Sequence, residues 1–158
     1  MDARLSCGTL VLFALLSTGA SEARARADDP RARCAAAGDD DRPRPLPPEI
    51  AQAARRVLNL TAEPLDDLRR TTVYRCMGGR VWLCNRGANI VCGKAGASRA
   101  SAAVAAFCRE RPGEDVPMVV TGHATIHSWQ CMGAQARIVR SLALDRRGFA
   151  SVNWTPLP

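Results

Sequence analysis

Residues 71–131 decide the fold of this chain, and they read TTVYRCMGGRVWLCNRGANIVCGKAGASRASAAVAAFCRERPGEDVPMVVTGHATIHSWQC. This stretch contains five of the seven cysteines, both histidines, the only lysine and the only tyrosine. Cysteines at this density in a small chain are typical of domains that disulfide bonds stabilise. We therefore expect the stretch to form the stapled centre of one small domain.

Residues 1–27 have the three-part pattern of a secretory signal peptide. A short charged start precedes an apolar run over residues 5–20, and small residues offer cleavage after Ala27 or, as a second choice, after Ala23. A membrane-spanning helix needs roughly 20 apolar residues, more than this run supplies, and no later stretch approaches that length. We expect a protein that is periplasmic or secreted, with no transmembrane segment after cleavage.

Cleavage removes Cys7 and leaves six cysteines. An even number in a small exported chain predicts a disulfide framework, although composition leaves the pairing open. Zinc binding is the alternative, but the sequence contains no paired C-x-x-C motif. The candidate disulfide residues are Cys34, Cys76, Cys84, Cys92, Cys108 and Cys131.

The composition divides the mature chain into two parts. Residues 28–47 are rich in proline and in charges of both signs, which predicts a disordered linker. Cys34 lies inside this segment, so it either attaches the segment to the domain or remains a free thiol. Residues 48–158 then form a single cysteine-rich α+β domain, as a length of 158 residues favours.

A helix and a hairpin open the domain. The helix begins at Pro47 and Pro48 and carries one apolar stripe at Ile50, Ala53, Ala54, Val57 and Leu58. The hairpin spans residues 73–84 and turns at Gly78-Gly79, because both glycines tolerate a positive φ. This turn places Tyr74, Cys76, Val81 and Leu83 on one face and Val73, Arg75, Trp82 and Cys84 on the other.

The hairpin register restricts the disulfide pairing. Cys76 and Cys84 point to opposite faces and should not bond to each other. A local bridge between Cys84 and Cys92 could close the loop between them. The segment YRCMG at residues 74–78 resembles WQCMG at residues 129–133, and this short echo favours a link between Cys76 and Cys131.

The remaining residues predict one more helix and further antiparallel strands. Ser98 is the expected N-cap of a helix over residues 98–109. Strands are expected at residues 116–121, 125–131, 137–144 and 149–154, with a tight turn at residues 145–148. The predicted fold is therefore an antiparallel sheet of about five to six strands with two helices.

A formal net charge of +7 favours an anionic partner. We expect an anionic glycan, a lipid head group or an envelope protein, and no nucleic acid. The glycines of residues 92–98 could expose backbone N–H groups to an anion. Arg75, Arg86 and Lys94 are the candidate anion-binding side chains, and a solvated loop is the simpler interpretation.

His123 and His127 are weak candidates for metal binding or acid–base chemistry. β-branched residues between them favour a turn and strand over a helix. The sequence has no H-E-x-x-H motif and no evident third ligand, so ordinary hydrogen-bonding histidines are the simpler interpretation. We expect no cofactor.

The order of the motifs from Tyr74 onward resembles small, cysteine-rich secreted bacterial proteins of unknown function. Separately, Tyr74, Cys76 and Gly79 match the Y-x-C-x-x-G opening of periplasmic C-type lysozyme inhibitors, which are small β-barrels. That family also uses an S-G-x-x-Y element, whereas this chain has no tyrosine besides Tyr74. The resemblance therefore carries no inhibitory residue over to this sequence.

Together these observations predict an exported, non-enzymatic envelope protein that binds an anionic partner. A lysozyme-inhibitor-like protein and a hydrolase or metal-binding enzyme that uses the two histidines are the alternatives. Histidines placed in a cleft with a carboxylate would favour the enzyme, whereas arginines spread over one convex face would favour binding.

Overall fold

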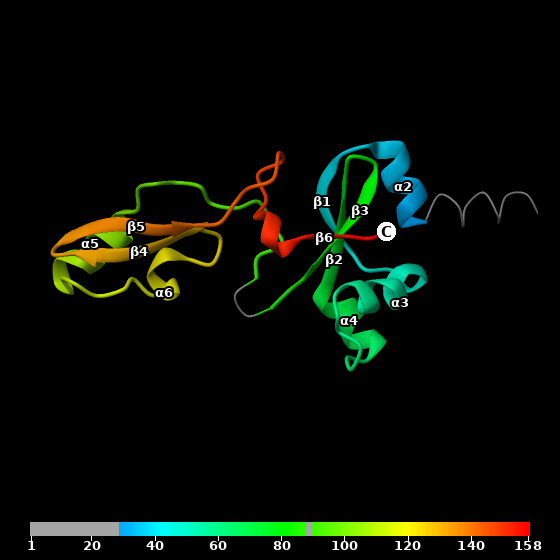
Figure 1. Ribbon diagram of the computed structural model, residues 1–158, viewed down its shortest axis with the longest axis horizontal. Coiled ribbons are helices and arrows are strands. Elements are labelled where there is room, and N and C mark those ends of the chain that lie inside the picture. The colour runs from blue at the N-terminus through cyan, green and yellow to red at the C-terminus, as the bar shows by residue number, and fades with distance from the viewer. Residues whose placement is uncertain (1–28, 88–89) are drawn as a thin grey trace, which may run out of the picture.

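The computed structural model describes residues 29–87 and 90–158, so the predicted signal peptide lies outside the described residues. Two lobes follow one another along the long axis of the molecule (Figure 1). The sheet lobe contains α2 (Pro30–Ala37), β1 (Asp40–Pro45), α3 (Pro48–Val57), α4 (Leu65–Thr71), β2 (Thr72–Met77), β3 (Arg80–Asn85) and β6 (Thr155–Pro156). The hairpin lobe contains α5 (Ala102–Glu110), α6 (Met118–Thr121), β4 (His127–Met132) and β5 (Gln135–Ser141).

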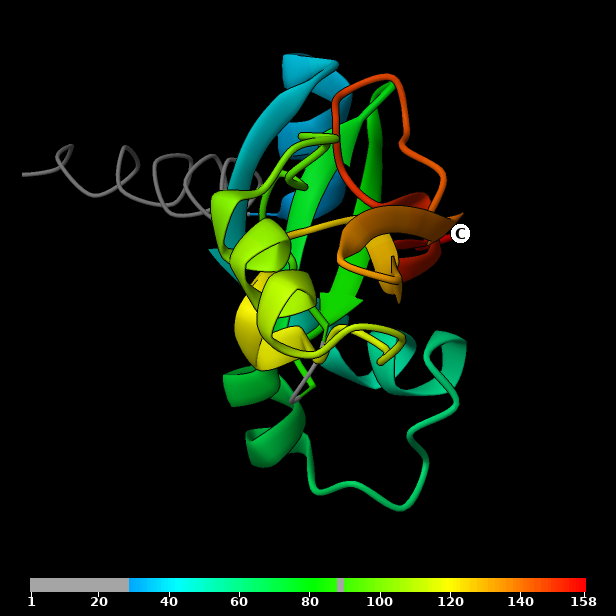
Figure 2. The ribbon, with the colours of Figure 1, turned by 90° about the vertical axis from the view of Figure 1, so that its left-hand side faces the viewer.

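Two segments connect the lobes and form the neck of the molecule. They are residues 90–101 and residues 142–154, and the second contains the 3₁₀ helix η1 (Ser151–Asn153). Seen from the hairpin lobe, α3 and α4 lie at one end of the β2–β3 hairpin (Figure 2). No helix among the described residues is long and apolar enough to cross a membrane.

The α+β class is confirmed, with antiparallel pairing between all neighbouring strands. The strands form two sheets instead of one: a four-stranded sheet in the order β1-β2-β3-β6, and the two-stranded β4–β5 sheet. The described residues contain five α-helices where the sequence predicted two, because α2, α4 and α6 are short. Short helices depend on tertiary packing for their stability and leave a weak local pattern.

The β2–β3 hairpin confirms the predicted turn and register. Gly78 and Gly79 have φ values of 61° and 74°, and Cys76 pairs with Val81 across the strands. One face packs against the helices of the sheet lobe in a core that includes Ile50 and Leu68. The other face packs against Phe149 and Trp154 in a second core. A third core fills the hairpin lobe around Val104 and Trp129.

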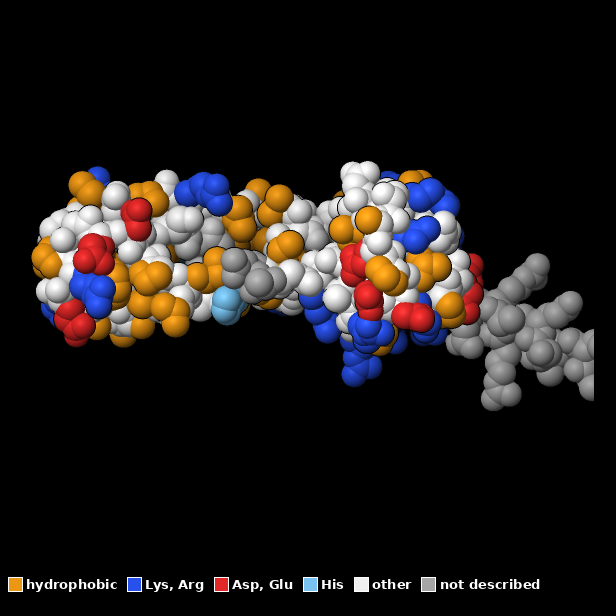
Figure 3. All heavy atoms as spheres, turned by 90° about the horizontal axis from the view of Figure 1, so that it is seen from below, with side chains coloured by type: hydrophobic (Ala, Val, Ile, Leu, Met, Phe, Trp, Pro, Cys, Tyr) orange, Lys and Arg blue, Asp and Glu red, His pale blue; other side chains and the backbone are white. Residues whose placement is uncertain are grey.

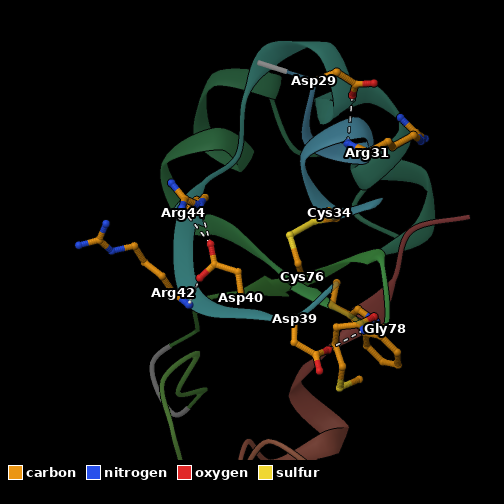
Figure 4. The surroundings of a disulfide bond; sticks show 11 residues. Asp29, Arg31, Cys34, Asp39, Asp40, Arg42, Arg44, Cys76 and Gly78 are labelled. Atoms are coloured by element: carbon orange, nitrogen blue, oxygen red, sulfur yellow. Dashed lines mark hydrogen bonds and ion pairs between the residues drawn. A yellow bond between two sulfur atoms is a disulfide. The ribbon is translucent and has the colours of Figure 1, made fainter. Parts of the chain in front are cut away.

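The prediction of a disordered linker at residues 28–47 is wrong for the residues that the structure describes. The side chain of Asp29 accepts a hydrogen bond from the Arg31 backbone N–H at the start of α2, where Pro30 occupies the first turn. β1 then pairs with β2 as an edge strand, a position that tolerates its prolines. The bond between Cys34 and Cys76 fixes α2 against the sheet (Figure 4).

Three disulfide bonds join Cys34 to Cys76, Cys84 to Cys92, and Cys108 to Cys131. The structure confirms the local Cys84–Cys92 bridge and the absence of a bond between Cys76 and Cys84. The predicted link between Cys76 and Cys131 is wrong, because β2 and β4 belong to different sheets in different lobes. Three disulfide bonds in a chain of this size are typical of proteins outside the reducing cytoplasm.

The last third of the chain differs from the prediction at both of its ends. α5 begins later than expected, and the Oγ atom of Ser101, not that of Ser98, accepts the capping hydrogen bond from Val104. The expected strand at residues 116–121 is α6, which follows Pro117 and ends at Gly122, where φ is 79°. β4 and β5 confirm the next two strands, with slightly shifted ends.

The expected strand at residues 149–154 is largely η1. Phe149 and Trp154 are five positions apart, yet both belong to the same core. A straight strand would direct side chains with odd and even numbers to opposite faces, so the chain must turn to bury both. The tight turn expected at residues 145–148 is present, and the Gly148 N–H donates to the Asp145 carbonyl at 3.1 Å.

Candidate functional site

A cleft of about 390 Å³ lies where the hairpin lobe meets the neck. Its lining comes from the neck, from α6 and the segment that leads into β4, and from the two strands of the hairpin. The lining residues are Val91, Gly93, Ala95, Asp115, Val116, Met118, residues 121–129, Val139, Arg140, Leu142, Ala150 and Asn153. Both histidines are among them.

Backbone contacts at Gly96 hold the cleft against the neck. The Gly96 N–H donates to the Ala124 carbonyl at 2.6 Å, and the Ile126 N–H donates to the Gly96 carbonyl at 3.1 Å. A Cβ atom at position 96 would lie 3.4 Å from the Ala124 oxygen, an ordinary van der Waals distance. The two hydrogen bonds hold the segment that follows His123 against the neck.

His127 is buried at the start of β4, and both ring nitrogens have partners. Nδ1 lies 2.7 Å from the Ser141 hydroxyl on β5, and Nε2 lies 3.3 Å from the Ala97 carbonyl in the neck. A carbonyl oxygen can only accept, so neutral His127 carries its proton on Nε2 and accepts from Ser141 at Nδ1. The side chain thus joins the two strands of the hairpin to the neck.

His123 is exposed in the same cleft and has no hydrogen bond or ion pair with any described residue. The described residues contain no group of three or more His, Cys, Asp or Glu side chains that could hold a metal ion. His127 also has both ring nitrogens engaged, so a metal would have to displace Ser141 or Ala97. This arrangement does not fit a metal centre. The described residues supply no set of ligands for metal binding by His123 and His127.

Arg140 and Asp115 are cleft residues that the sequence analysis did not single out. Neither forms a salt bridge within the described parts of the chain, and both side chains are exposed. Arg140 lies opposite Ser128 at the point where the β4–β5 register shifts. A register shift depends on the pairing of two strands, so no local pattern in the sequence indicates that Arg140 faces the cleft.

The structure buries Arg75, the first of the predicted anion-binding residues. Its guanidinium carbon lies 4.0 Å from the centre of the Phe149 ring and 4.6 Å from that of Trp154, and Asp145 pairs with it. Burial lowers the pKa of this guanidinium, and the negative charge of Asp145 opposes that shift. Arg75 therefore stabilises the core and is not accessible to a ligand.

Lys94 and Arg86 remain near the surface, but they do not join Arg75 in one site. The Lys94 Nζ atom lies 3.0 Å from Oδ2 of Asp41, and the Arg147 Nε atom lies 2.8 Å from Oδ1 of the same carboxylate. The hydrogen bond from Arg147 is the main reason why the pKa of Asp41 falls to about 2. Arg86 is exposed at the end of β3.

The three residues that match the lysozyme-inhibitor motif lie in the core and in a turn of the sheet lobe. Tyr74 and Cys76 are buried in the core of the sheet lobe, and Gly79 forms the β2–β3 turn. No family model, no curated protein and no solved structure matches this chain.

Proposed function

We propose that this protein is an exported, non-enzymatic binding module and that the cleft beside β4 receives an anionic ligand. The three disulfide bonds and the predicted signal peptide support a location in the periplasm or outside the cell. The net charge of +7 supports an anionic partner, such as an acidic glycan or a lipid head group. The position of Arg140 supports the cleft as the place where that partner binds.

Most other positive charges near the neck are already neutralised. Arg75, Lys94, Arg146 and Arg147 all pair with aspartates. These pairs connect β2, β1 and the residue before β1 to the neck, and three aspartates offset three of the four positive charges, since Lys94 and Arg147 share Asp41. Arg140, by contrast, lines a cavity and has no acidic partner among the described residues.

Arg140 is an exposed arginine in the lining of the cleft. Apolar side chains such as Ile126, Val139 and Leu142 line the cleft beside it. A guanidinium binds carboxylates and phosphates in a two-pronged geometry. The position of Arg140 in the lining of the cleft, without an acidic partner among the described residues, is the single observation that carries the proposal.

Calorimetric titration of the mature protein with trigalacturonate and with octyl phosphate would test this proposal. Arg140→Gln should weaken binding of an anionic probe at least tenfold. Arg137→Gln is the matched control, since Arg137 lies on the same strand, is exposed, and does not line the cleft. An equal loss of affinity in both variants would mean that the overall charge, and not the cleft, causes binding, and it would contradict the cleft as the site. Failure of both probes to bind would contradict the proposal as a whole.

A second candidate function follows from the pair formed by Ser141 and His127. The Ser141 hydroxyl donates to His127 Nδ1, and the Ala97 carbonyl orients the ring through Nε2. Serine nucleophiles are activated by a histidine in this kind of arrangement. In a hydrolase, Ser141 Oγ would attack an ester carbonyl and its proton would pass to His127 Nδ1, which would return it to the alcohol that leaves as the ester bond breaks. Water would then hydrolyse the acyl-Ser141 ester. A fluorophosphonate probe should then label Ser141 in the native protein and fail to label Ser141→Ala. Absence of labelling would contradict the hydrolase hypothesis and leave the binding module as the proposed function.

A further inference from the structure

We infer that the ligand of the cleft is a single-chain amphiphile: an alkyl chain with one anionic head group. This inference rests on the proposed function and adds the chemical nature of the part of the ligand that is attached to its anionic group. It follows from the character of the cleft walls, from exposed apolar side chains at its rim and from the separation of its charged groups.

The walls of the cleft combine aliphatic and polar residues in similar numbers. Val91, Val116, Met118, Ile126, Val139 and Leu142 supply aliphatic side chains from the neck, α6 and the hairpin. Trp129 is the only Trp, Tyr or Phe residue in the lining, and only 7% of it is exposed. Sugar-binding and base-binding sites use aromatic faces as stacking platforms. This cleft offers no open aromatic face, and it therefore favours an alkyl chain over a glycan.

Two of these aliphatic residues expose a large apolar surface to solvent. Met118 on α6 is 41% exposed, and Val139 on β5 is 55% exposed. Exposed apolar area that rims a concave site is a frequent mark of ligand binding. In the view of Figure 3, apolar side chains are scattered over both lobes, with acidic and basic side chains between them. An alkyl chain in the cleft would cover Met118 and Val139.

The volume limits the ligand to a small molecule. A cavity of about 390 Å³ lies near the lower end of the range for small-molecule sites, roughly 300–1,000 Å³. The cleft is too small for two acyl chains with their head group, which excludes a complete bilayer phospholipid as its occupant. Free fatty acids and lysophospholipids share the required chemistry, and the experiment below separates these two sources.

The charged groups indicate where the head group would lie. Arg140 attracts an anion, and His123 adds a donor and, when protonated, a second positive charge. Asp115 is the one carboxylate of the lining and would repel an anionic head group. A zwitterionic ligand would instead use Arg140 and Asp115 together. The two ligand classes therefore predict opposite effects of Asp115→Asn.

The test is calorimetric titration of the mature protein with octanoate, decanoate, dodecanoate and dodecanol, each below its micelle concentration. Affinity should increase about fourfold for each added methylene that enters the cleft. Dodecanol should bind at least tenfold more weakly than dodecanoate. Titration with lysophosphatidylglycerol separates the two sources of such a ligand. Tighter binding of dodecanoate would indicate a free fatty acid, and tighter binding of lysophosphatidylglycerol would indicate a lysophospholipid.

Matched variants separate the cleft from general apolar surface. Met118→Ser combined with Val139→Ser should weaken dodecanoate binding at least tenfold. Val119→Ser is the control, because Val119 is 87% exposed on the same helix but does not line the cleft. Asp115→Asn should leave binding of dodecanoate equal or tighter, because the carboxylate of Asp115 repels the anionic head group. Weaker binding in this variant would contradict the placement of the head group beside Arg140.

The outcomes distinguish this inference from the proposed function. Affinity that is independent of chain length, together with Arg140-dependent binding of trigalacturonate, would overturn the amphiphile and leave the anion-binding module intact. Failure of every anion to bind would overturn both. Chain-length dependence that persists unchanged in the Met118 and Val139 double variant would place the ligand elsewhere and contradict the inference.

Discussion

The guanidinium carbon of Arg75 lies 4.0 Å from the centre of the Phe149 ring, inside the second core. Trp154 covers it at 4.6 Å, and two of its nitrogens have no hydrogen-bond partner among the described residues. Two aromatic faces and Asp145 therefore hold this cation in place. The contact joins β2 to the segment that closes the neck, so it positions one wall of the cleft.

Replacing Arg75 should destabilise the fold strongly. Arg75→Met keeps most of the side-chain volume but leaves the Asp145 carboxylate without its partner in the core. Removing one member of a buried ion pair costs about 3–5 kcal/mol. Denaturant unfolding monitored by circular dichroism measures the change. Arg86→Ala, at an exposed position, is the control and should stay within about 0.5 kcal/mol. A similar small effect for Arg75→Met would contradict the structural role.

Asp41 should make stability depend on pH in the acid range. Its pKa of about 2 in the folded protein lies below its ordinary value of 3.8, mainly because Arg147 donates a hydrogen bond to it. A lowered folded-state pKa contributes stability above the unfolded-state value, and this contribution is lost as the pH falls through the folded-state value. Stability should therefore decrease between about pH 4 and pH 2. Asp41→Asn should flatten that decrease, and an unchanged pH profile would contradict the pairing.

The mature protein should contain no free thiol. Alkylation without reductant should modify none of its six cysteines, and alkylation after reduction in denaturant should modify all six. Mass spectrometry distinguishes the two results. Each bridge should contribute roughly 2–4 kcal/mol, so replacing Cys34 and Cys76 by serine should lower the unfolding midpoint measurably. Native protein in which Cys34 is alkylated would contradict the attachment of α2.

The sequence predicts best where the determining contacts are local. The β2–β3 hairpin depends on Gly78-Gly79 and on alternation within twelve residues, and its register, its faces and the Cys84–Cys92 bridge all follow. The helix α3 likewise follows from one apolar stripe. In each case the residues that stabilise the element are the residues that compose it.

Contacts between distant segments explain what the sequence did not predict. Residues 30–45 look unsuited to a core, yet Cys34 bonds to Cys76 across 42 positions and Arg147 binds Asp41 across 106. These partners offset the cost of ordering a segment that has few apolar residues. Composition alone contains no information about such partners, so the segment resembled a linker.

The sequence offered some residues of the cleft and missed others. Both histidines were weak candidates for chemistry in the sequence, and both line the cleft, which leaves their role a prediction. The sequence also identified Arg75, which lies in the core, and it did not identify Arg140. Charge type is visible in a sequence, but burial and ion pairing decide which charges a ligand can reach.

The binding claim is tested most directly by NMR of the mature protein during titration with dodecanoate and, separately, with trigalacturonate. Backbone and side-chain resonances of Arg140, His123 and Trp129 should shift in a saturable manner with at least one probe, because these residues line the cleft. Resonances of Arg137, outside the cleft, should move little. Saturable shifts confined to the sheet lobe, or no shift with either probe, would contradict the cleft as the ligand site.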